Sequence, residues 1–329
     1  MSRTVRALLA VASAALLSAP NALWAQSANG ADKYPRQPIR IMVGFSAGST
    51  TDILARTVAA KLLEAWGEPV VVENRPGAGG VVASQALLSA PPDGHTLMVV
   101  SAGHAVSAAL YSKLPYNTET DFAGVTLLAT VPSILVVSPG ANIKSIKELL
   151  AIARSKPGAF YSSPGIGSAN HLAGAYFSSL ANIQAVHVAY KGIPGALQAA
   201  MTGEVLFNLS PIVNVLPAAT SGKVLALATS TSKRALAMPD LPTLAEAGVP
   251  GYSFDPWFGL LTSSKTPRPI IARLNAEVAR ILGLAEVKKR LLSLGAEPNP
   301  MSPEAFDTLV REEIQKFSKI IRAANIKVE

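Results

Sequence analysis

The segment GFSAG at residues 44–48 contains the serine whose setting most clearly suggests chemistry. It follows the apolar run 39–43 and precedes a stretch, 50–66, with the pattern of a helix. A G-x-S-x-G motif between a strand and a helix forms the nucleophile elbow of serine hydrolases, where the serine attacks an acyl carbon. Ser46 is therefore a candidate nucleophile, and its hydroxyl is equally a candidate hydrogen-bond donor to a bound ligand.

Two features of the chain argue against a hydrolase. The nucleophile strand of an α/β-hydrolase has strands before it, and one of their loops supplies part of the oxyanion hole. Residues 26–40 are too few for one such strand–helix unit. No spacing among the histidines selects a triad, although Asp93 with His104 and Asp121 with His171 both fit the order. The hydrolase stays open as an alternative of a different class.

A binding function fits the same loop better. Ligands of open α/β sheets lie beyond the carboxyl ends of the strands, where this loop is placed. Gly48 allows a tight turn, Ser46, Ser49 and Thr50 offer hydroxyls, and the start of a helix offers free N–H groups to an anion. No P-loop lysine follows, which favours a carboxylate over a nucleotide. Ser49 or Thr50 also suits the helix N-cap, with Asp52 complementing the dipole.

The segment SPGIGSANHL at 163–172 repeats this arrangement further along the chain. A strand ends, Gly167 turns the chain, Ser168 and Asn170 offer polar atoms, and a helix begins near His171. Two such loops facing one another would form one anion-binding cleft. The alternative is that both are ordinary turns between a strand and a helix.

Other polar residues give weaker signals. Ser101 and His104 follow the predicted strand 96–100 and are placed to reach the cleft, although His104 equally suits a helix start. Asn208 and Ser210 end the predicted strand 204–210 and are placed to line the cleft too, whereas His187 suits the core. No His, Asp and Glu cluster has metal-ligand spacing, and no pair of carboxylates is placed for acid–base chemistry. We therefore expect no metal and no cofactor.

The elements that must position these loops alternate between strand and helix. Strands are predicted at 39–43, 68–74, 96–100, 132–138, 159–163, 185–190, 204–210, 223–230 and 255–263. Helices are predicted at 50–66, 81–89, 146–155, 171–180, 267–282, 284–295 and 302–325, with a turn and helix at 191–203 and a further helix between the strands 204–210 and 223–230. Continuous apolar strands separated by helices are typical of parallel α/β sheets. We expect an α/β protein with two βαβ domains.

The last third of the sequence has too few strands for a third domain. The simplest topology returns the chain at about residue 255 to complete the first domain. We therefore expect one lobe at 26–132 with 255–329, a second lobe at 133–254, and a central cleft between them.

The first residues have the composition of an export signal. Arg3 and Arg6 form a positive region, 7–17 is apolar, and a cleavage site follows at Ala25. The apolar run is shorter than the roughly 20 residues that span a bilayer. We expect residues 1–25 to be a signal peptide and the mature protein to be periplasmic; a permanent anchor is the alternative.

Composition limits the classes of partner. The net charge is +8, but the basic residues are scattered and aromatic residues make up only 6%, so a nucleic-acid surface is not expected. The absence of cysteine excludes disulfides, thiolate metal sites and lipid attachment through an N-terminal Cys. We expect a monomer.

Several segments, in order along the chain, resemble one known family. They are GFSAGSTTDILAR, VVVENRPGAGG, PPDGHTLM, YSSPGIGSANHLAG, HVAYKG, LPTLAEAGVPGY and WFGLL. Together they resemble the periplasmic substrate-binding receptors of tripartite tricarboxylate transporters, the Bug receptors, over nearly all the mature chain. The resemblance implies a two-lobed Venus-flytrap fold, type II-like, without enzymatic activity. It also implies a small carboxylate held by loop backbones, hydroxyls and ordered water.

Carried over to this sequence, the resemblance places one binding loop at 45–52 and the other at 167–171. With the polar strand ends, the expected substrate-binding residues are Phe45, Ser46, Ala47, Gly48, Ser49, Thr50, Asp52, Ser101, Gly167, Ser168, Ala169, Asn170, His171 and Asn208. Three positions depart from the family pattern: Ser49 replaces a glycine, Ala189 a proline and His95 a tyrosine. The side chain of Ser49 is expected to intrude where the backbone usually meets the carboxylate.

The leading hypothesis is a periplasmic protein that captures a small organic carboxylate by lobe closure and delivers it to transporter subunits in the membrane. Dicarboxylates, tricarboxylates, amino acids and aromatic acids all fit it. A sensor that passes its liganded state to a membrane receptor is the second hypothesis.

Overall fold

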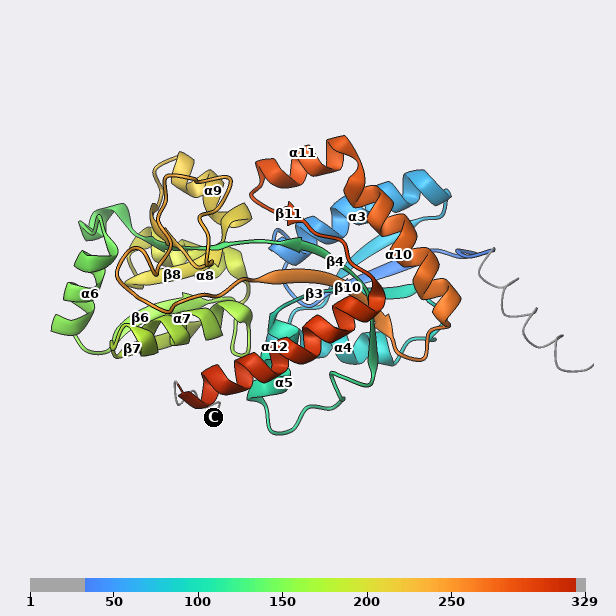
Figure 1. Ribbon diagram of the computed structural model, residues 1–329, viewed down its shortest axis with the longest axis horizontal. Coiled ribbons are helices and arrows are strands. Elements are labelled where there is room, and N and C mark those ends of the chain that lie inside the picture. The colour runs from blue at the N-terminus through green and yellow to red at the C-terminus, as the bar shows by residue number, and fades with distance from the viewer. Residues whose placement is uncertain (1–32, 324–329) are drawn as a thin grey trace, which may run out of the picture.

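A computed structural model describes residues 33–323 of the chain. The predicted signal peptide therefore lies outside the described residues. Two β-sheets, each covered by helices, form two lobes side by side along the long axis (Figure 1). No helix within the described range is both long and apolar enough to cross a membrane.

The first lobe is built on a six-stranded sheet with the order β11-β4-β10-β3-β1-β2. Its strands are β1 (Ile39–Val43), β2 (Val70–Asn74), β3 (Thr96–Ser101), β4 (Phe122–Thr130), β10 (Trp257–Ser263) and β11 (Glu297–Pro298). Its helices are α3 (Thr50–Trp66), α4 (Val81–Leu88), α5 (Gly103–Leu110), α10 (Arg268–Gly283), α11 (Ala285–Ser293) and α12 (Pro303–Ala323).

The second lobe is built on a five-stranded sheet with the order β7-β6-β8-β5-β9. Its strands are β5 (Ser133–Val137), β6 (Ala159–Ser163), β7 (Ala185–Ala189), β8 (Phe207–Pro211) and β9 (Leu225–Thr229). Its helices are α6 (Ile146–Ser155), α7 (Ala169–Leu180), α8 (Ile193–Thr202) and α9 (Ile212–Thr220).

Both sheets are mixed, so the prediction of parallel sheets is wrong for part of each. Strands β2, β1 and β3 are parallel, as are β7, β6 and β8. Strand β10 is antiparallel to β3 and β4, and β5 is antiparallel to β8 and β9. Each of these two strands carries the chain in from the other lobe, so it enters its sheet in the opposite direction to its neighbours.

The sequence analysis missed β4, β11 and α5. Strand β4 and strand β5 form one nearly continuous apolar run, 122–137, which the chain divides between the two sheets at Val131 and Pro132. Other bounds shift by a few residues: β8 begins at Phe207 rather than at 204, and α7 begins at Ala169 rather than near His171.

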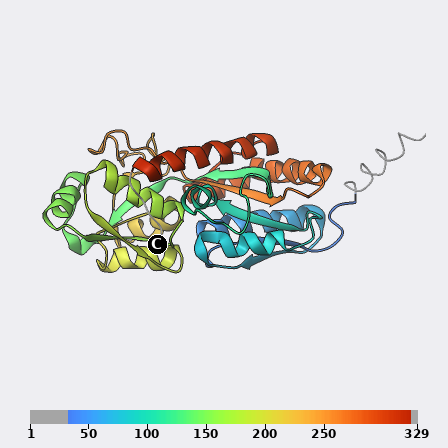
Figure 2. The same ribbon diagram turned by 90° about the horizontal axis from the view of Figure 1, so that it is seen from below.

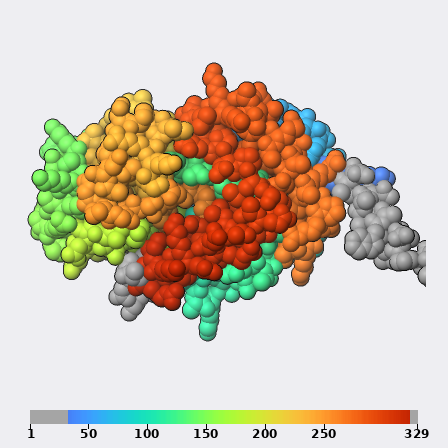
Figure 3. Space-filling view, in the orientation of Figure 1, coloured from blue at the N-terminus to red at the C-terminus, as the bar shows by residue number. Residues whose placement is uncertain are grey.

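Two crossing segments join the lobes and are hydrogen-bonded to one another. The Val131 N–H donates to the Pro256 carbonyl at 2.9 Å, and the Phe254 N–H donates to the Ser230 carbonyl at 2.9 Å. The Ser230 hydroxyl donates to the Phe254 carbonyl at 2.7 Å and accepts from the Ser133 N–H at 3.2 Å. These segments run side by side between α11 and α12, in a hollow of the surface (Figure 3).

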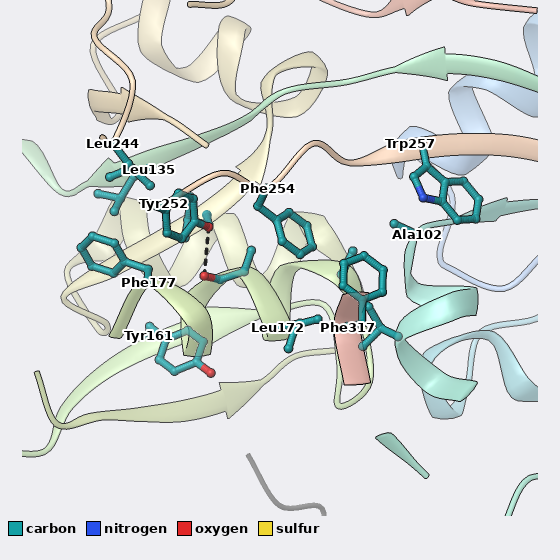
Figure 4. Packing of buried hydrophobic residues seen from close by; sticks show 14 of the residues in the cluster. Ala102, Leu135, Tyr161, Leu172, Phe177, Leu244, Tyr252, Phe254, Trp257 and Phe317 are labelled. Carbon is teal, nitrogen blue, oxygen red and sulfur yellow. Dashed lines mark hydrogen bonds between the residues drawn. The ribbon is translucent and has the colours of Figure 1, made fainter. Parts of the chain in front are cut away.

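Helix α12 lies across both lobes (Figure 2). It packs on β4 and α5 in the first lobe and on α7 in the second. Phe306 meets Trp257 edge to face at 5.5 Å between ring centroids, and Phe317 stacks on Phe254 of the crossing segment at the same distance. One apolar core therefore continues from the second lobe past Phe254 to α12 (Figure 4).

Candidate ligand-binding site between the lobes

Two helix N-termini, one from each lobe, begin the candidate site. Ser49 is the N-cap of α3, and its hydroxyl accepts from the Asp52 N–H at 3.4 Å. Ser168 is the N-cap of α7 in the same manner, accepting from the His171 N–H at 3.2 Å. Helix geometry leaves the first N–H groups of each helix without an intrahelical partner, and the dipole makes these ends positive.

Both helix starts line one pocket, here called the interlobe pocket. From the first lobe and its crossing segment it is lined by Phe45, Thr51, Ser101, Pro256 and Phe258. From the second lobe it is lined by Ser133, Pro164, Ser168, Ala169, Asn170, Ile193 and Pro211. The cavity that remains there has a volume of only about 20 Å³, so the side chains of the two lobes nearly fill the pocket.

Direct contacts between the lobes explain the closed pocket. The side-chain amide of Asn214, on α9, accepts from the Thr50 hydroxyl at 2.7 Å and donates to the Gly48 carbonyl at 2.9 Å. Ser46 Oγ lies where a Cβ on Gly192 would be, so only glycine fits there. The first binding loop is therefore held against the second lobe by backbone and side-chain contacts.

Within the first predicted loop, the residues divide between the pocket and the support of the loop. Phe45 lines the pocket, Ala47 and Gly48 are exposed, and Thr50 faces Asn214. Ser46 Oγ is buried and has no hydrogen-bond partner within the described part of the chain. It lies beside Gly192, and Ser46 is not among the residues that line the interlobe pocket.

Asp52 supports this loop from inside. It accepts from the Gly48 N–H at 3.0 Å, from Arg56 and from Asn74. Burial alone raises the pKa of this carboxyl, but the hydrogen bonds from Arg56, Gly48 and Asn74 together hold the pKa below its ordinary value. The carboxylate of Asp52 therefore stays ionised and bonded within the protein, and Asp52 is not among the residues that line the interlobe pocket.

In the second predicted loop, Ser168, Ala169 and Asn170 line the pocket. The Asn170 amide donates to the Leu209 carbonyl at 2.6 Å, which fixes the start of α7 to β8. Gly167 has a left-handed φ of 76°, and its N–H donates to His171 Nδ1 at 3.3 Å. Gly167 and His171 are not among the residues that line the pocket.

His171 is buried and pairs with the half-buried His187. Its ring stacks on His187 with 3.9 Å between centroids, and His187 Nε2 contacts Ser163 Oγ at 2.6 Å. Burial lowers the pKa of His171 to about 4, and burial with the neighbouring His171 lowers that of His187 to about 3. Both rings are therefore neutral at pH 7, and the acceptor that Gly167 needs at His171 Nδ1 is present.

Of the two remaining predicted residues, one lines the interlobe pocket and the other does not. Ser101 lines the pocket, and its Oγ accepts from the Gly103 N–H at 3.2 Å. Asn208, on β8, is fully buried and does not line the pocket. Its amide nitrogen donates to Ser162 Oγ at 2.9 Å, and its Oδ1 has no partner in residues 33–323.

The prediction missed the apolar half of the lining and the amide that bridges the lobes. The missed lining residues are Ser133, Pro164, Ile193, Pro211, Pro256 and Phe258. Thr51, which also lines the pocket, lies inside the predicted loop 45–52. Pro211 lies next to a predicted strand and Phe258 lies in one. The rule that ligands lie beyond strand ends was the one signal in the sequence that could have indicated these two residues as part of the site. Asn214 stands alone in an apolar helix and carries no motif.

A second, smaller pocket adjoins the first. It shares Phe45 and Ser101 with the interlobe pocket and extends between them and His104, Ser107 and Tyr116. His104 is fully buried, which lowers its pKa to about 4, and its Nε2 has no partner among the residues described. We refer to this space as the His104 pocket.

Ser46 Oγ has no hydrogen bond to a histidine or other base among the described residues, so a serine nucleophile is not formed there. The structure does contain a contact between Ser163, on β6, and His187, on β7, but Ser163 is 0% exposed. Across the described chain, no three or more His, Asp or Glu side chains gather in a group that would hold a metal ion.

Comparison with known proteins identifies the family. A sequence model described as the tripartite tricarboxylate transporter family receptor matches residues 54–326. The chain belongs to this family. The receptor is 32% identical to the protein BugT of Bordetella pertussis over 302 residues, which is 91% of this chain and 93% of BugT.

Solved structures agree with this assignment. A protein of R. palustris, solved with adipate, is 34% identical and superposes with a TM-score of 0.87, covering 89% of this chain and 99% of that one. MatC from Rhodopseudomonas palustris, solved with bound malate, is 35% identical with a TM-score of 0.83, covering 88% and 100%. The predicted two-lobed α/β fold and the resemblance to the Bug receptors are confirmed.

Proposed function

We propose that this receptor captures a small organic carboxylate in the periplasm and delivers it to a tripartite transporter in the membrane. The observation that carries the proposal is the convergence of two helix N-termini, those of α3 and α7, on one pocket between the lobes. Two similar proteins were solved with the carboxylates adipate and malate, which supports the same class of ligand here.

The chemistry of the loops suits a carboxylate held without a cation. The free N–H groups at Thr50, Thr51, Ala169 and Asn170 are donors in the field of two helix dipoles. Ser46 Oγ adds a donor that no described residue uses. Hydrogen bonds to a charged group contribute about 1.5–3 kcal/mol each, so a few of them suffice for tight binding.

The cellular setting forms part of the proposal. Residues 1–25 would be the signal peptide, residues 26–132 with 255–329 the first lobe, and 133–254 the second. The crossing segments at Val131 and Pro256 would be the hinge on which a monomeric receptor closes over its ligand.

The experiment begins with mass spectrometry of ligand released from the purified protein, followed by calorimetry with that carboxylate. Ser46→Ala should weaken binding by about 10- to 150-fold with an unchanged melting temperature, because the hydroxyl has no bond within the protein to lose. Ser168→Ala should weaken binding and also lower stability by about 1 kcal/mol, because it removes a helix cap. Ser89→Ala, at an exposed serine, is the control. Unchanged affinity in both loop variants would refute the site.

We propose further that the receptor has no hydrolase activity. The absence of a contact between Ser46 and any histidine in the described chain supports this. A fluorophosphonate probe should leave the protein unlabelled while carboxylate binding is intact; labelling that Ser46→Ala abolishes would overturn the statement.

A further inference from the structure

We propose that Gly79 and Gly103, two glycines of the first lobe, are positioning residues for ligand binding. Neither lines the interlobe pocket. Together they form a contact, here called the glycine contact, against which the second binding loop rests when the lobes close. This role rests on the proposed function and adds to it the residues that allow closure to be completed.

The segment VENRPGAGG, at 72–80, ends in a turn that contacts both binding loops. Its last residues form the short helix η1 (Ala78–Gly80). A Cβ added to Gly44, immediately before the first binding loop, would lie 2.7 Å from the Cα of Gly80. A Cβ added to Gly79 would lie 2.9 Å from the carbonyl oxygen of Ile166, immediately before the second binding loop. The turn therefore fills the space between the two loops with backbone alone.

Helix α5 presents one face to the same part of the second lobe. Gly103, Ser107 and Tyr111 are spaced by four residues, which places them on one side of a helix. A Cβ added to Gly103 would lie 3.3 Å from the backbone nitrogen of Ala169. The Ser107 hydroxyl donates to the Gly167 carbonyl at 3.5 Å, and a Cβ added to Gly167 would lie 2.9 Å from the Tyr111 ring. The absence of a side chain at Gly103 lets the start of α5 approach the start of α7 this closely.

The glycine contact lies beside the candidate ligand site. The second-lobe segment that it holds, 166–169, includes Ser168 and Ala169, which line the interlobe pocket. Gly79 and Ser107 line the adjoining His104 pocket. Each of these contacts joins one lobe to the other, so each is lost when the lobes separate. A contact made only in the closed form changes the closed fraction, and the apparent dissociation constant varies inversely with that fraction.

Gly79→Ala tests the turn, with Gly222→Ala as the matched control. Both glycines have a left-handed φ, 65° and 69°, so alanine at either position should lower the melting temperature of the ligand-free protein by a similar amount. Nothing lies within 4 Å of a Cβ on Gly222, whereas a Cβ on Gly79 meets the second lobe. Calorimetry with adipate and with malate, the carboxylates of the similar solved proteins, should show about 10-fold weaker binding for Gly79→Ala alone.

Gly103→Leu tests the contact of α5 without a cost in backbone conformation, because leucine has a higher helix propensity than glycine. Gly283→Leu is the matched control, at the exposed last residue of α10, where a Cβ would have no neighbour within 4 Å. We expect Gly103→Leu to weaken binding about 10-fold and Gly103→Ala about threefold, mainly through faster dissociation. The ligand-free proteins should melt no lower than the unchanged receptor. Gly103→Ala keeps the test valid if Gly103→Leu is unfolded.

Spin labels measure closure itself. The chain has no cysteine, so Leu63→Cys on α3 and Leu180→Cys on α7 place one label on each lobe at exposed positions. Double electron–electron resonance, with and without adipate or malate, should show a closed population that falls in Gly79→Ala and Gly103→Leu and is kept in both controls.

Equal affinities or equal closed populations in the glycine-contact variants and their controls would overturn the proposal. If neither adipate nor malate binds, but the closed population of the ligand-free protein still falls in Gly79→Ala and Gly103→Leu, the glycine contact stands and the proposed function fails for these carboxylates. A receptor with no closed population, with or without carboxylate, would overturn both.

Discussion

Ser49 sits at the position where the sequence departs from its family, and its side chain is turned into its own loop. It is 1% exposed, caps α3 and contacts Thr51 Oγ1 at 3.0 Å. It is not among the residues that line the interlobe pocket. The expectation that this hydroxyl intrudes on the ligand stays a prediction, and the structure gives Ser49 a capping role beside it.

Substitution of Ser49 separates these two roles. Ser49→Ala should lower the free energy of unfolding by about 1 kcal/mol, whereas Ser49→Gly should lower it by only a few tenths, because glycine is tolerated at an N-cap. Urea unfolding measures both. If Ser49→Gly changes the order of ligand affinities while its stability stays near that of the unchanged protein, the hydroxyl also acts on the ligand.

Buried histidines make stability depend on pH. Burial lowers the pKa of His104 and of His171 to about 4, below the value of about 6.5 in an unfolded chain. The unfolded state therefore binds more protons between these values. Stability should be full above about pH 6.5 and should fall as the pH decreases, by up to about 1.4 kcal/mol per pH unit for each histidine.

Urea unfolding at pH 7, 6 and 5 measures this slope, and the window lies above the titration of most carboxylates. His171→Asn should reduce the change in the free energy of unfolding per pH unit by about the contribution of one histidine. A flat profile between pH 7 and 5 would show that these rings are solvated in the folded protein.

At the scale of elements, α9 holds the first binding loop closed through Asn214. The two hydrogen bonds of its amide join Thr50 and Gly48 across the cleft, at 2.7 and 2.9 Å. Each such bond contributes about 1 kcal/mol. Asn214→Ala should therefore weaken ligand binding about 5- to 30-fold and mainly raise the dissociation rate, because the open state becomes more populated.

Stopped-flow dissociation and small-angle scattering check this prediction. Scattering should show a larger radius of gyration for unliganded Asn214→Ala than for the unchanged protein. Asn299→Ala, at an exposed asparagine in the loop before α12, is the matched control. A slower association with an unchanged dissociation rate would contradict a closing role for Asn214.

The sequence predicted the βα units around both loops because their signals are local. Each unit is marked by an apolar run, a turn glycine and a serine cap, at 49 or at 168, that lie within a few residues of one another in the sequence. The division of the run 122–137 between two sheets is not local, because it depends on where β10 enters between β3 and β4. Asn214 and Ile193 were missed for the same reason: each is placed at the site by the closure of one lobe on the other.

At the scale of the whole molecule, α12 ties the lobes together through Phe317. This side chain is 1% exposed and stacks on Phe254 of the crossing segment. Phe317→Ala should lower the free energy of unfolding by about 3–5 kcal/mol, the usual cost of emptying a phenylalanine site. Thermal and chemical unfolding measure it.

Phe160→Ala is the control. Phe160, on β6, is 48% exposed, so this substitution should lower the free energy of unfolding far less. If the two variants lose similar amounts of unfolding free energy, the contact of α12 with the crossing segment contributes little to holding the lobes together.

The strand order of the six-stranded sheet also makes the first lobe depend on the last third of the chain. The five-stranded sheet uses one continuous stretch of chain, 133–229. The other sheet needs β10, at residues 257–263, which lies between β3 and β4. Without β10, the facing edges of β3 and β4 would be unpaired, and unpaired edges are prone to aggregation. A chain truncated between about residues 230 and 256 would therefore contain every strand of the second sheet and an incomplete first sheet.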